Sequence, residues 1–189
     1  MSVRSPPQRH VKGALFVDYV RMLRARGDVD WSGMLEPVDL SYLVQRIDPN
    51  AWYPMETFER MGLAILAEIA HGDLEMVRAF GRASVDWLCN TYATLVAPDD
   101  PRDTLMRFQV LRRSFFDYAA LEIGSLCDGE ASVLVTYGMG PRAEEAACWQ
   151  TLGFLERLLE IAGGAQVDAS FASRAWTGDV VTTIELRWT

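Results

Sequence analysis

Histidine and cysteine are scarce in this sequence of 189 residues. His10 lies in a polar stretch near the N-terminus, and His71 falls at the expected end of a helix, where a histidine typically interacts with the last carbonyl groups. The cysteines Cys89, Cys127 and Cys148 are odd in number and have no short paired spacing. This argues against a disulfide framework and a zinc knuckle, and it predicts a reducing, cytoplasmic location.

Basic residues and long apolar runs are also lacking. The sequence has 18 Lys and Arg residues against 26 Asp and Glu residues, with a formal net charge of -8. Because binding to nucleic acid requires a surplus of positive charge to neutralise phosphates, we expect no nucleic-acid partner. No apolar run approaches the length of a membrane span, and the N-terminal MSVRSPPQRHVKG lacks the apolar core of a signal peptide.

Catalytic motifs are missing as well. There is no HExxH, nucleophile elbow, Walker or GxGxxG motif, and the segment 138–141 (Gly-Met-Gly-Pro) lacks the third glycine of a phosphate-binding pattern. Glu144 and Glu145 in the following helical turn disfavour a bound phosphate, and adjacent helical residues point about 100° apart, so they do not form an acid–base pair. Cys89 and Cys148 fall within helices, where we expect small core residues. We therefore expect no enzymatic activity.

Half of the residues are hydrophobic, enough for one compact domain with a sizeable core. We expect a flexible leader over residues 1–10 and a single domain over 11–189. Apolar residues three and four positions apart predict its helices at 11–26, 40–47, 54–71, 73–96 and 99–115.

Local signals predict where three of these helices begin and how two of them pack. Asp39 and Asp73 are candidate caps of the second and fourth helices, and Pro54 is the expected first residue of the third. The small residues Gly81 and Ser84 suit close approach of another helix. We therefore expect residues 54–96 to form a helical hairpin.

The pattern changes to alternation after Tyr118. Asp128-Gly129 is a two-residue turn signal between two alternating stretches, which predicts a β-hairpin. A helix follows from Pro141 to Gly163-Gly164, and two more alternating stretches run to Trp188. The sequence thus predicts an α+β domain, in which a helical part (11–116) packs on an antiparallel sheet with one inserted helix (117–189).

The segment 148–188, from CWQTLGFLERLLE to VVTTIELRW, resembles the closing part of V4R domains. These domains share their fold with the haem-binding nitric-oxide sensors (H-NOX) and with the Bet3-type subunits of the TRAPP trafficking complex. The whole chain also resembles a myxobacterial family of uncharacterised domains, through VKGALF at 11–16, Trp-Tyr-Pro at 52–54 and Phe-Gly-Arg at 80–82. The resemblance implies a V4R/H-NOX-like fold.

Departures from these relatives bear on cofactors. Zinc-binding V4R domains have cysteines on either side of the Gly-Asp, where this chain has Ser173 and Thr182, so we expect no zinc. H-NOX proteins need a proximal histidine and a YxSxR motif. Residues 101–116 contain no histidine, and 137–142 (Tyr-Gly-Met-Gly-Pro-Arg) does not match, so we expect no haem and no other cofactor.

The resemblance implies a protein that binds something between its helical layer and its sheet. We predict a non-enzymatic cytosolic sensing domain for a small apolar ligand, with Arg112 as a polar anchor. The same residues also fit plain core packing, and the alternative function is a TRAPP-like adaptor or scaffold that binds a partner protein or forms a homodimer. The predicted ligand-binding residues are Trp87, Tyr92, Phe108, Leu111, Arg112, Phe115 and Trp149.

Overall fold

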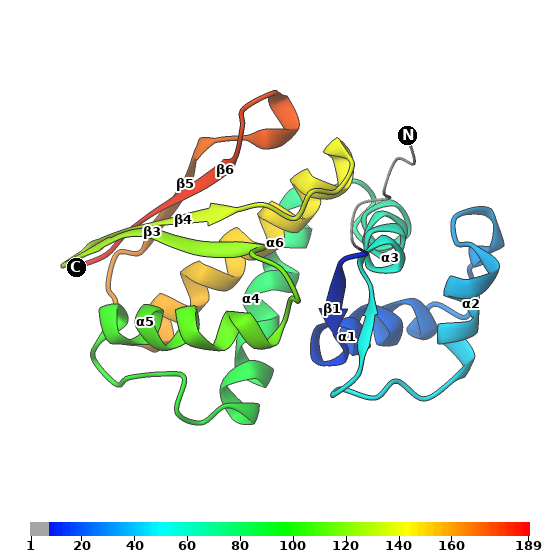
Figure 1. Ribbon diagram of the computed structural model, residues 1–189, viewed down its shortest axis with the longest axis horizontal. Coiled ribbons are helices and arrows are strands. Elements are labelled where there is room, and N and C mark those ends of the chain that lie inside the picture. Colours follow the sequence, from blue (N-terminus) through cyan, green and yellow to red (C-terminus); the bar gives the residue numbers. More distant parts are fainter. Residues whose placement is uncertain (1–7) are drawn as a thin grey trace, which may run out of the picture.

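The computed structural model describes residues 8–189 and has the expected α+β architecture (Figure 1). Residues 1–7 of the expected leader lie outside the described residues. The α-helices are α1 (Gly13–Ala25), α2 (Pro37–Val44), α3 (Met55–Glu68), α4 (Leu74–Thr91), α5 (Pro101–Leu111) and α6 (Pro141–Ile161). The strands are β1 (His10–Lys12), β2 (Trp52–Pro54), β3 (Leu121–Cys127), β4 (Glu130–Val135), β5 (Asp168–Ser173) and β6 (Thr182–Arg187).

The first three helices and the small sheet of β1 and β2 lie on one side of the molecule, and the larger sheet lies on the other side with α4, α5 and α6 (Figure 1). β1 pairs antiparallel with β2, with Val11 opposite Tyr53. His10 therefore belongs to a strand, although we expected it in the leader, because its neighbour Val11 is fully buried and fixes the strand in the core.

Two helices of the first half begin at other residues than expected. Helix α2 is capped by Glu36, while Asp39 lies in its first turn and accepts a hydrogen bond from the backbone nitrogen of Glu36. Pro54 is the last residue of β2, with an extended backbone, and α3 begins at Met55. In α2, the side chains of Glu36 and Asp39 satisfy free backbone N–H groups at the start of the helix. In α3, no side chain caps the helix, and the nitrogen of Met55 donates to the carbonyl of Arg9 at 2.9 Å.

Helix α4 begins after Asp73, whose carboxylate accepts hydrogen bonds from the nitrogens of Glu75 and Met76, as expected for its cap. The expected hairpin of residues 54–96 is wrong, however, because α4 packs mainly against α6, while α3 packs against α1 and α6. A Cβ atom on Gly81 would lie 1.9 Å from the backbone oxygen of Gln150. The small residue thus permits close helix contact, but the partner is α6.

The four-stranded sheet has the order β3-β4-β6-β5, with every neighbouring pair antiparallel. The β3–β4 turn contains Gly129 with φ +80°, which a glycine adopts without strain, in agreement with the Asp128-Gly129 signal. Helix α6 begins at Pro141 as expected, and Gly163 follows its end with φ +94°.

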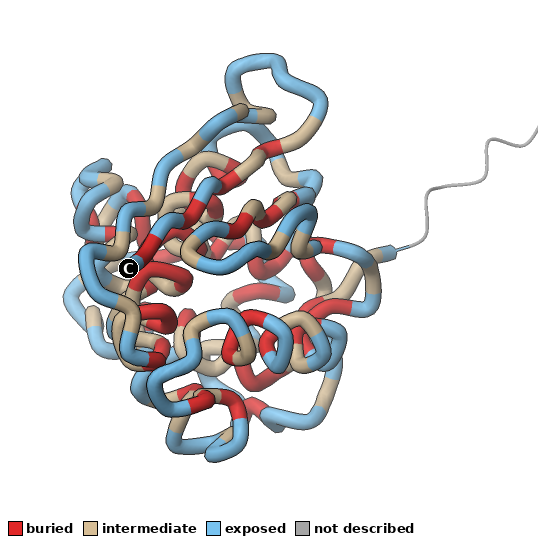
Figure 2. Tube along the Cα trace, turned by 90° about the vertical axis from the view of Figure 1, so that its left-hand side faces the viewer, coloured by how far each residue is buried: buried red, intermediate tan, exposed pale blue. Residues whose placement is uncertain are grey.

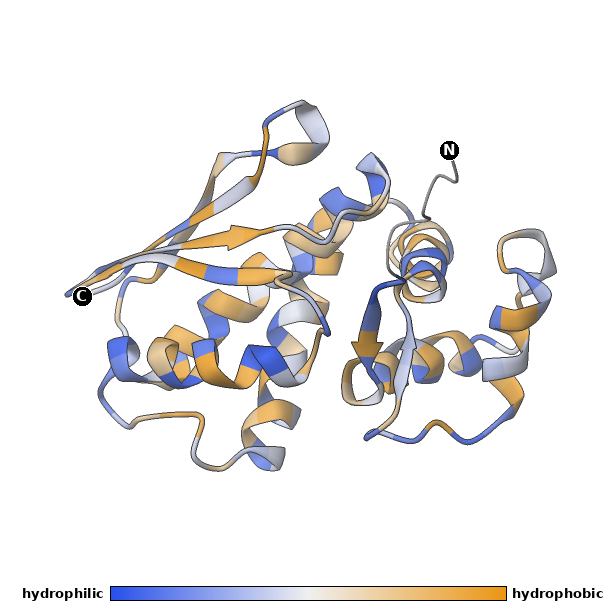
Figure 3. Cartoon of the chain, viewed as in Figure 1, coloured by the Kyte–Doolittle hydropathy of each residue, from blue (hydrophilic) through white to orange (hydrophobic). Residues whose placement is uncertain are grey.

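The core lies between this sheet and the helices. Figure 2 shows the buried stretches gathered in the interior, and Figure 3 shows hydrophobic and hydrophilic residues interleaved along helices and strands. The side chains from the inner face of the sheet include Val133, Val135, Ile184 and Leu186, each at most 1% exposed. Burial of such side chains supplies the main driving force for folding. No helix within residues 8–189 is both long and apolar enough to cross a membrane.

Candidate ligand-binding site

A cavity of about 110 Å³ lies where the two sides of the molecule meet. Its walls come from α1 and α3 on one side and from α4, α5, β3 and α6 on the other. Most of the lining is apolar, which is the usual character of a small-molecule site. The lining residues are Leu15, Asp18, Tyr19, Phe58, Ser84, Leu88, Phe108, Phe115, Phe116, Leu121, Tyr137, Ala147, Gln150, Thr151 and Phe154.

Aromatic rings form much of the cavity wall near the sheet. The rings of Phe108 and Phe154 are 5.3 Å apart, and those of Phe116 and Tyr137 are 5.7 Å apart. Tyr19 stacks on Phe58 at 4.2 Å on the side of α1 and α3. Aromatic faces of this kind bind flat apolar molecules well.

Two tyrosine hydroxyls line the cavity and are already hydrogen-bonded. Tyr137 Oη lies 2.6 Å from Thr151 Oγ1, and since Thr151 donates its hydrogen to the carbonyl of Ala147, Tyr137 is the donor. Tyr19 Oη donates to Gln150 Oε1 at 2.6 Å. Burial raises the pKa of both tyrosines, so both phenols are neutral at physiological pH.

Asp18 is the carboxylate of the cavity lining, and it is half-buried. Burial raises its pKa, and Arg21, whose Nη1 lies 3.6 Å from Oδ1, acts in the opposite direction. Asp18, Ser84, Tyr19 and Gln150 also line an open groove of about 820 Å³ between α1 and α4. The cavity therefore adjoins the molecular surface at this groove.

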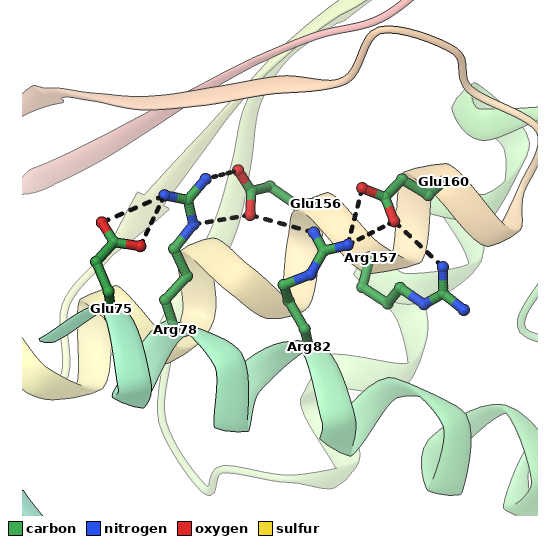
Figure 4. Close-up of polar contacts among 6 residues, drawn as sticks. All are labelled: Glu75, Arg78, Arg82, Glu156, Arg157 and Glu160. Carbon is green, nitrogen blue, oxygen red and sulfur yellow. Dashed lines mark hydrogen bonds and ion pairs between the residues drawn. The ribbon is translucent and has the colours of Figure 1, made fainter. Parts of the chain in front are cut away.

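An ion-pair network fixes the wall formed by α4 and α6 (Figure 4). The buried Glu156 of α6 accepts hydrogen bonds from Arg78 and Arg82 of α4, with Arg78 Nε 2.9 Å from Oε2. Arg82 also donates to Glu160, with 2.7 Å between Nη2 and Oε2. Charged hydrogen bonds are stronger than neutral ones, so the network holds the two helices in register beside the cavity.

The backbone N–H groups of the loop before α6 are hydrogen-bonded to Glu144, in the first turn of that helix. Glu144 is buried and accepts hydrogen bonds from the backbone nitrogens of Tyr137 (3.0 Å) and Met139 (2.8 Å). Burial raises the pKa of Glu144, and these backbone hydrogen bonds oppose the rise. Because the carboxylate occupies the N–H groups that a phosphate needs, the loop is not a phosphate site.

Two of the residues expected to bind ligand line the cavity, Phe108 and Phe115. Trp87 and Tyr92 line a surface hollow of about 380 Å³, where Lys12 Nζ lies 4.4 Å from the centre of the Trp52 ring. Trp87 also lines the open groove between α1 and α4.

The other three expected residues lie elsewhere. Trp149 is on another face of α6 and packs on Phe171 of β5, with ring centres 5.5 Å apart. Leu111 is half-buried beside the core and outside the lining. Arg112, the expected polar anchor, is buried outside the cavity, and burial lowers its pKa against the pull of Glu122. Its Nε has no hydrogen-bond partner among the described residues, and its Nη2 is 3.8 Å from Glu122 Oε1.

Sequence reasoning missed the polar residues Tyr19, Gln150, Tyr137 and Thr151. Tyr19 belongs to the apolar stripe of α1 and therefore reads as plain core. A signal was present in α6, where Gln150 and Thr151 interrupt a mainly apolar run. Polar residues in such a run indicate either a buried hydrogen-bond pair or a cavity.

The sequence matches no protein-family model and none of the curated proteins compared with it. Solved structures of H-NOX proteins share its fold. The S. oneidensis H-NOX protein in its Fe(II)NO ligation state superposes with a TM-score of 0.63 at 11% identity, covering 94% of this chain and 99% of that chain. Unliganded Fe(II) H-NOX from K. algicida has a TM-score of 0.62 at 11% identity, covering 94% of this chain and 96% of that chain. A T. tengcongensis H-NOX mutant has a TM-score of 0.61 at 11% identity, covering 94% of this chain and 97% of that chain. The chain therefore has an H-NOX-like fold.

Haem, the group of the H-NOX proteins, does not fit the residues present here. The described lining has no histidine, cysteine or methionine, and α5 has no histidine at any position. Tyrosine ligates haem iron in some proteins, but Tyr19 and Tyr137 are neutral and already hydrogen-bonded. A cavity of roughly 150 Å³ accommodates one benzene molecule, so a cavity of about 110 Å³ is far too small for a four-pyrrole macrocycle.

Metal-binding clusters are also lacking: residues 8–189 contain no group of three or more His, Cys, Asp or Glu side chains placed to hold an ion. The two positions compared with zinc ligands are occupied by internal hydrogen bonds. Ser173 Oγ donates to the carbonyl of Val181 at 2.7 Å, and Thr182 Oγ1 accepts from the nitrogen of Ala175 at 3.0 Å. Both hydroxyl groups therefore stabilise the β5–β6 connection.

Proposed function

We propose that this chain is a non-enzymatic sensing domain that binds a small, largely apolar ligand in the cavity between its helices and its sheet. The observation that carries the proposal is the cavity itself, which has aromatic walls and hydrogen-bonded, neutral phenols. The described lining offers one carboxylate, Asp18, and no nucleophile–base pair, which favours binding over catalysis. A cytoplasmic location and a role in signalling or regulation belong to the same proposal.

The size of the cavity limits the ligand to about one ring. A cavity of roughly 150 Å³ accommodates benzene. At about 110 Å³, the cavity takes a single small ring after modest movement of its walls. Ring stacking on Phe108, Phe154 and Phe116 supplies the main attraction, since aromatic pairs add to the energy of apolar burial.

Sensing follows from the position of the cavity between the two sides of the molecule. A ligand that touches Tyr19 and Phe58 on one side and Phe108 and Phe154 on the other favours the arrangement in which both sides are in contact with it. A ligand shifts a conformational equilibrium only by its differential affinity for the two states. Contacts to both sides provide such a difference.

Thermal unfolding with toluene as the probe tests the proposal. At a concentration about 100 times the dissociation constant, binding stabilises the fold by about 2.7 kcal/mol. For a chain of this length that raises the melting temperature by roughly 5–10 °C. The variant Ala147→Leu fills part of the cavity and should lose this rise, because Ala147 lines it. The exposed Ala79→Leu on α4 is the matched control and should keep the rise.

An unchanged melting temperature at saturating toluene would refute the proposal, as would an equal rise in Ala147→Leu. Native mass spectrometry of the purified protein adds a readout for a retained small molecule and for a homodimer. An exposed apolar patch on the helices of residues 54–96 would favour the alternative function of an adaptor. In the described chain, Met76 is the exposed large apolar residue of that range, at 38% exposure, so this observation does not favour the adaptor. Kinship with V4R and TRAPP proteins stays a prediction.

A further inference from the structure

The Tyr19–Gln150 hydrogen bond lies between the cavity and the open groove of α1 and α4. Both residues line the cavity, and both line the groove, as do Asp18 and Ser84. The donor and acceptor come from α1 and α6, two helices on opposite sides of the molecule. A ligand that enters from the groove therefore meets these four polar side chains before it reaches the aromatic wall.

The position of Gln150 is fixed by its backbone. A Cβ atom placed on Gly81 of α4 would lie 1.9 Å from the carbonyl oxygen of Gln150. The backbones of α4 and α6 are therefore already in contact here, and α6 cannot move closer to α4. The side chain extends from this fixed point to Tyr19 Oη at 2.6 Å. Pre-positioned polar groups of this kind give a site its selectivity, because they do not need to be ordered on binding.

The donors and acceptors of these side chains that remain free for a ligand can be identified. Tyr19 uses its one hydrogen on Gln150 Oε1, and Ser84 uses its hydrogen on the carbonyl of Gly81. Within residues 8–189, the amide nitrogen of Gln150 donates to no protein group. The site therefore offers amide N–H donors from Gln150 and acceptor oxygens from Tyr19, Ser84 and Asp18.

This combination distinguishes between classes of head group. An ammonium group has only donors and leaves the Gln150 amide hydrogens unmet. A carboxylate has only acceptors, so it leaves the acceptor oxygens of Tyr19, Ser84 and Asp18 without a donor. A hydroxyl group both accepts from Gln150 and donates to one of the neighbouring oxygens, so it satisfies both kinds of group at once.

We infer that the ligand is a neutral single-ring phenol, with its hydroxyl group at the Tyr19–Gln150 pair and its ring among Phe108, Phe116 and Phe154. This inference rests on the proposed function, because it assigns a ligand class to the same cavity. It adds Gln150 as the residue that determines specificity, and the groove between α1 and α4 as the entrance.

Phenol and toluene are suitable probes, because they differ only in a hydroxyl group replaced by a methyl group. Dissociation constants for both, and for benzylamine, are measured by calorimetry with the wild type, Gln150→Leu and Tyr19→Phe. We expect the preference for phenol over toluene to fall roughly tenfold in Gln150→Leu, because the hydroxyl then loses its donor. The control Gln109→Leu, on α5 and outside the cavity lining, should keep the wild-type preference.

The two proposals fail in different ways. If the wild type binds none of the probes, the proposed function and this inference both fall. If toluene and phenol bind but their ratio is the same in wild type and Gln150→Leu, the cavity stands and the assignment of a hydroxyl ligand is wrong. Tighter binding of benzylamine than of phenol would also overturn it. Should Gln150→Leu not fold, as judged by circular dichroism, Gln150→Glu gives the same comparison, because it has no amide donor and still accepts the hydrogen bond of Tyr19. Tyr19→Phe keeps the amide donor and should keep the preference for phenol.

Discussion

Gly153 of α6 lies directly against the backbone carbonyl of Arg78 on α4: a Cβ atom on Gly153 would be 2.1 Å from that oxygen. Gly81 makes the corresponding contact from α4 to Gln150. The two helices therefore touch backbone to backbone at both glycines. This contact sets the distance between α4 and α6, on which the ion pairs between the two helices and the cavity beside them depend.

Replacing Gly153 with alanine should destabilise the fold. The added methyl group overlaps a backbone oxygen that no rotation of a side chain can remove, so the helices must separate. Overpacking of this kind costs about 1–3 kcal/mol. Urea denaturation of Gly153→Ala measures the loss. Gly33→Ala is the control, because a Cβ atom there has nothing within 4 Å, and an equal loss in both variants would contradict the argument.

Glu156→Gln should also lower stability, by about 1.5–3 kcal/mol, because Arg78 and Arg82 lose the charge that they share. Glu156 is 4% exposed, so water does not replace the lost interaction. Glu75→Gln is the matched control, since Glu75 also accepts from Arg78 but its side chain is 64% exposed. Exposed pairs contribute at most about 1 kcal/mol. Similar losses in the two variants would show that the network is a surface feature.

The buried ion pair of Asp39 and Arg60 should make stability depend on acid. Burial alone would raise the pKa of Asp39, but hydrogen bonds from Arg60 (2.6 and 2.8 Å), Thr57 and the backbone of Glu36 hold the pKa below its usual value. A depressed pKa means that the folded state binds the proton less well than the unfolded state. The stabilisation is therefore present above the unfolded pKa of about 3.9 and is lost as the pH falls through the folded pKa.

This dependence is measured by comparing wild type with Asp39→Asn in urea at pH values from neutral to about 3. Near neutrality the variant should be less stable by about 1.5–3 kcal/mol. The difference should shrink below about pH 4, where the wild type loses its carboxylate and the variant has none to lose. A difference that stays constant across this range would mean that Asp39 stabilises the fold by packing and not by charge.

The purified protein should be colourless and should not bind added haemin specifically. The described cavity lining lacks a histidine, cysteine or methionine ligand and is too small for the macrocycle. Absorption spectra with and without haemin provide the measurement, and the spectrum of the mixture should be the sum of its parts. A shifted Soret band that disappears in Tyr19→Phe or Tyr137→Phe would identify a tyrosine ligand and overturn this conclusion.

The local signals in the sequence were sufficient for most elements of the fold. Three of these signals are the cap Asp73, the Asp128-Gly129 turn and Pro141. Each acts on backbone within one or two turns, so its effect can be predicted from neighbouring residues. The sequence did not predict which helix packs against α4. Periodicity shows which face of a helix is buried, but not which element covers it, and both α3 and α6 present suitable faces.

The cavity was predictable only in part for the same reason. Phe108 and Phe115 line the cavity and were predicted from apolar residues at helical spacing, but their role in ligand binding stays a prediction. Tyr19 and Gln150 are 131 residues apart in sequence, and neither has a local feature that points to the other. Contacts of that separation are set by the packing of the whole fold.

The same separation has a kinetic consequence. A cavity whose walls join residues 131 positions apart exists only after α1 and α6 have come together, and closing so long a loop is costly until other contacts support it. A ligand that binds in the cavity therefore has no site until α1 and α6 are in contact. Interactions that are absent from the transition state leave the folding rate unchanged and slow unfolding instead. A molecule held between Tyr19 and Phe108 would lengthen the lifetime of the folded chain without hastening its formation.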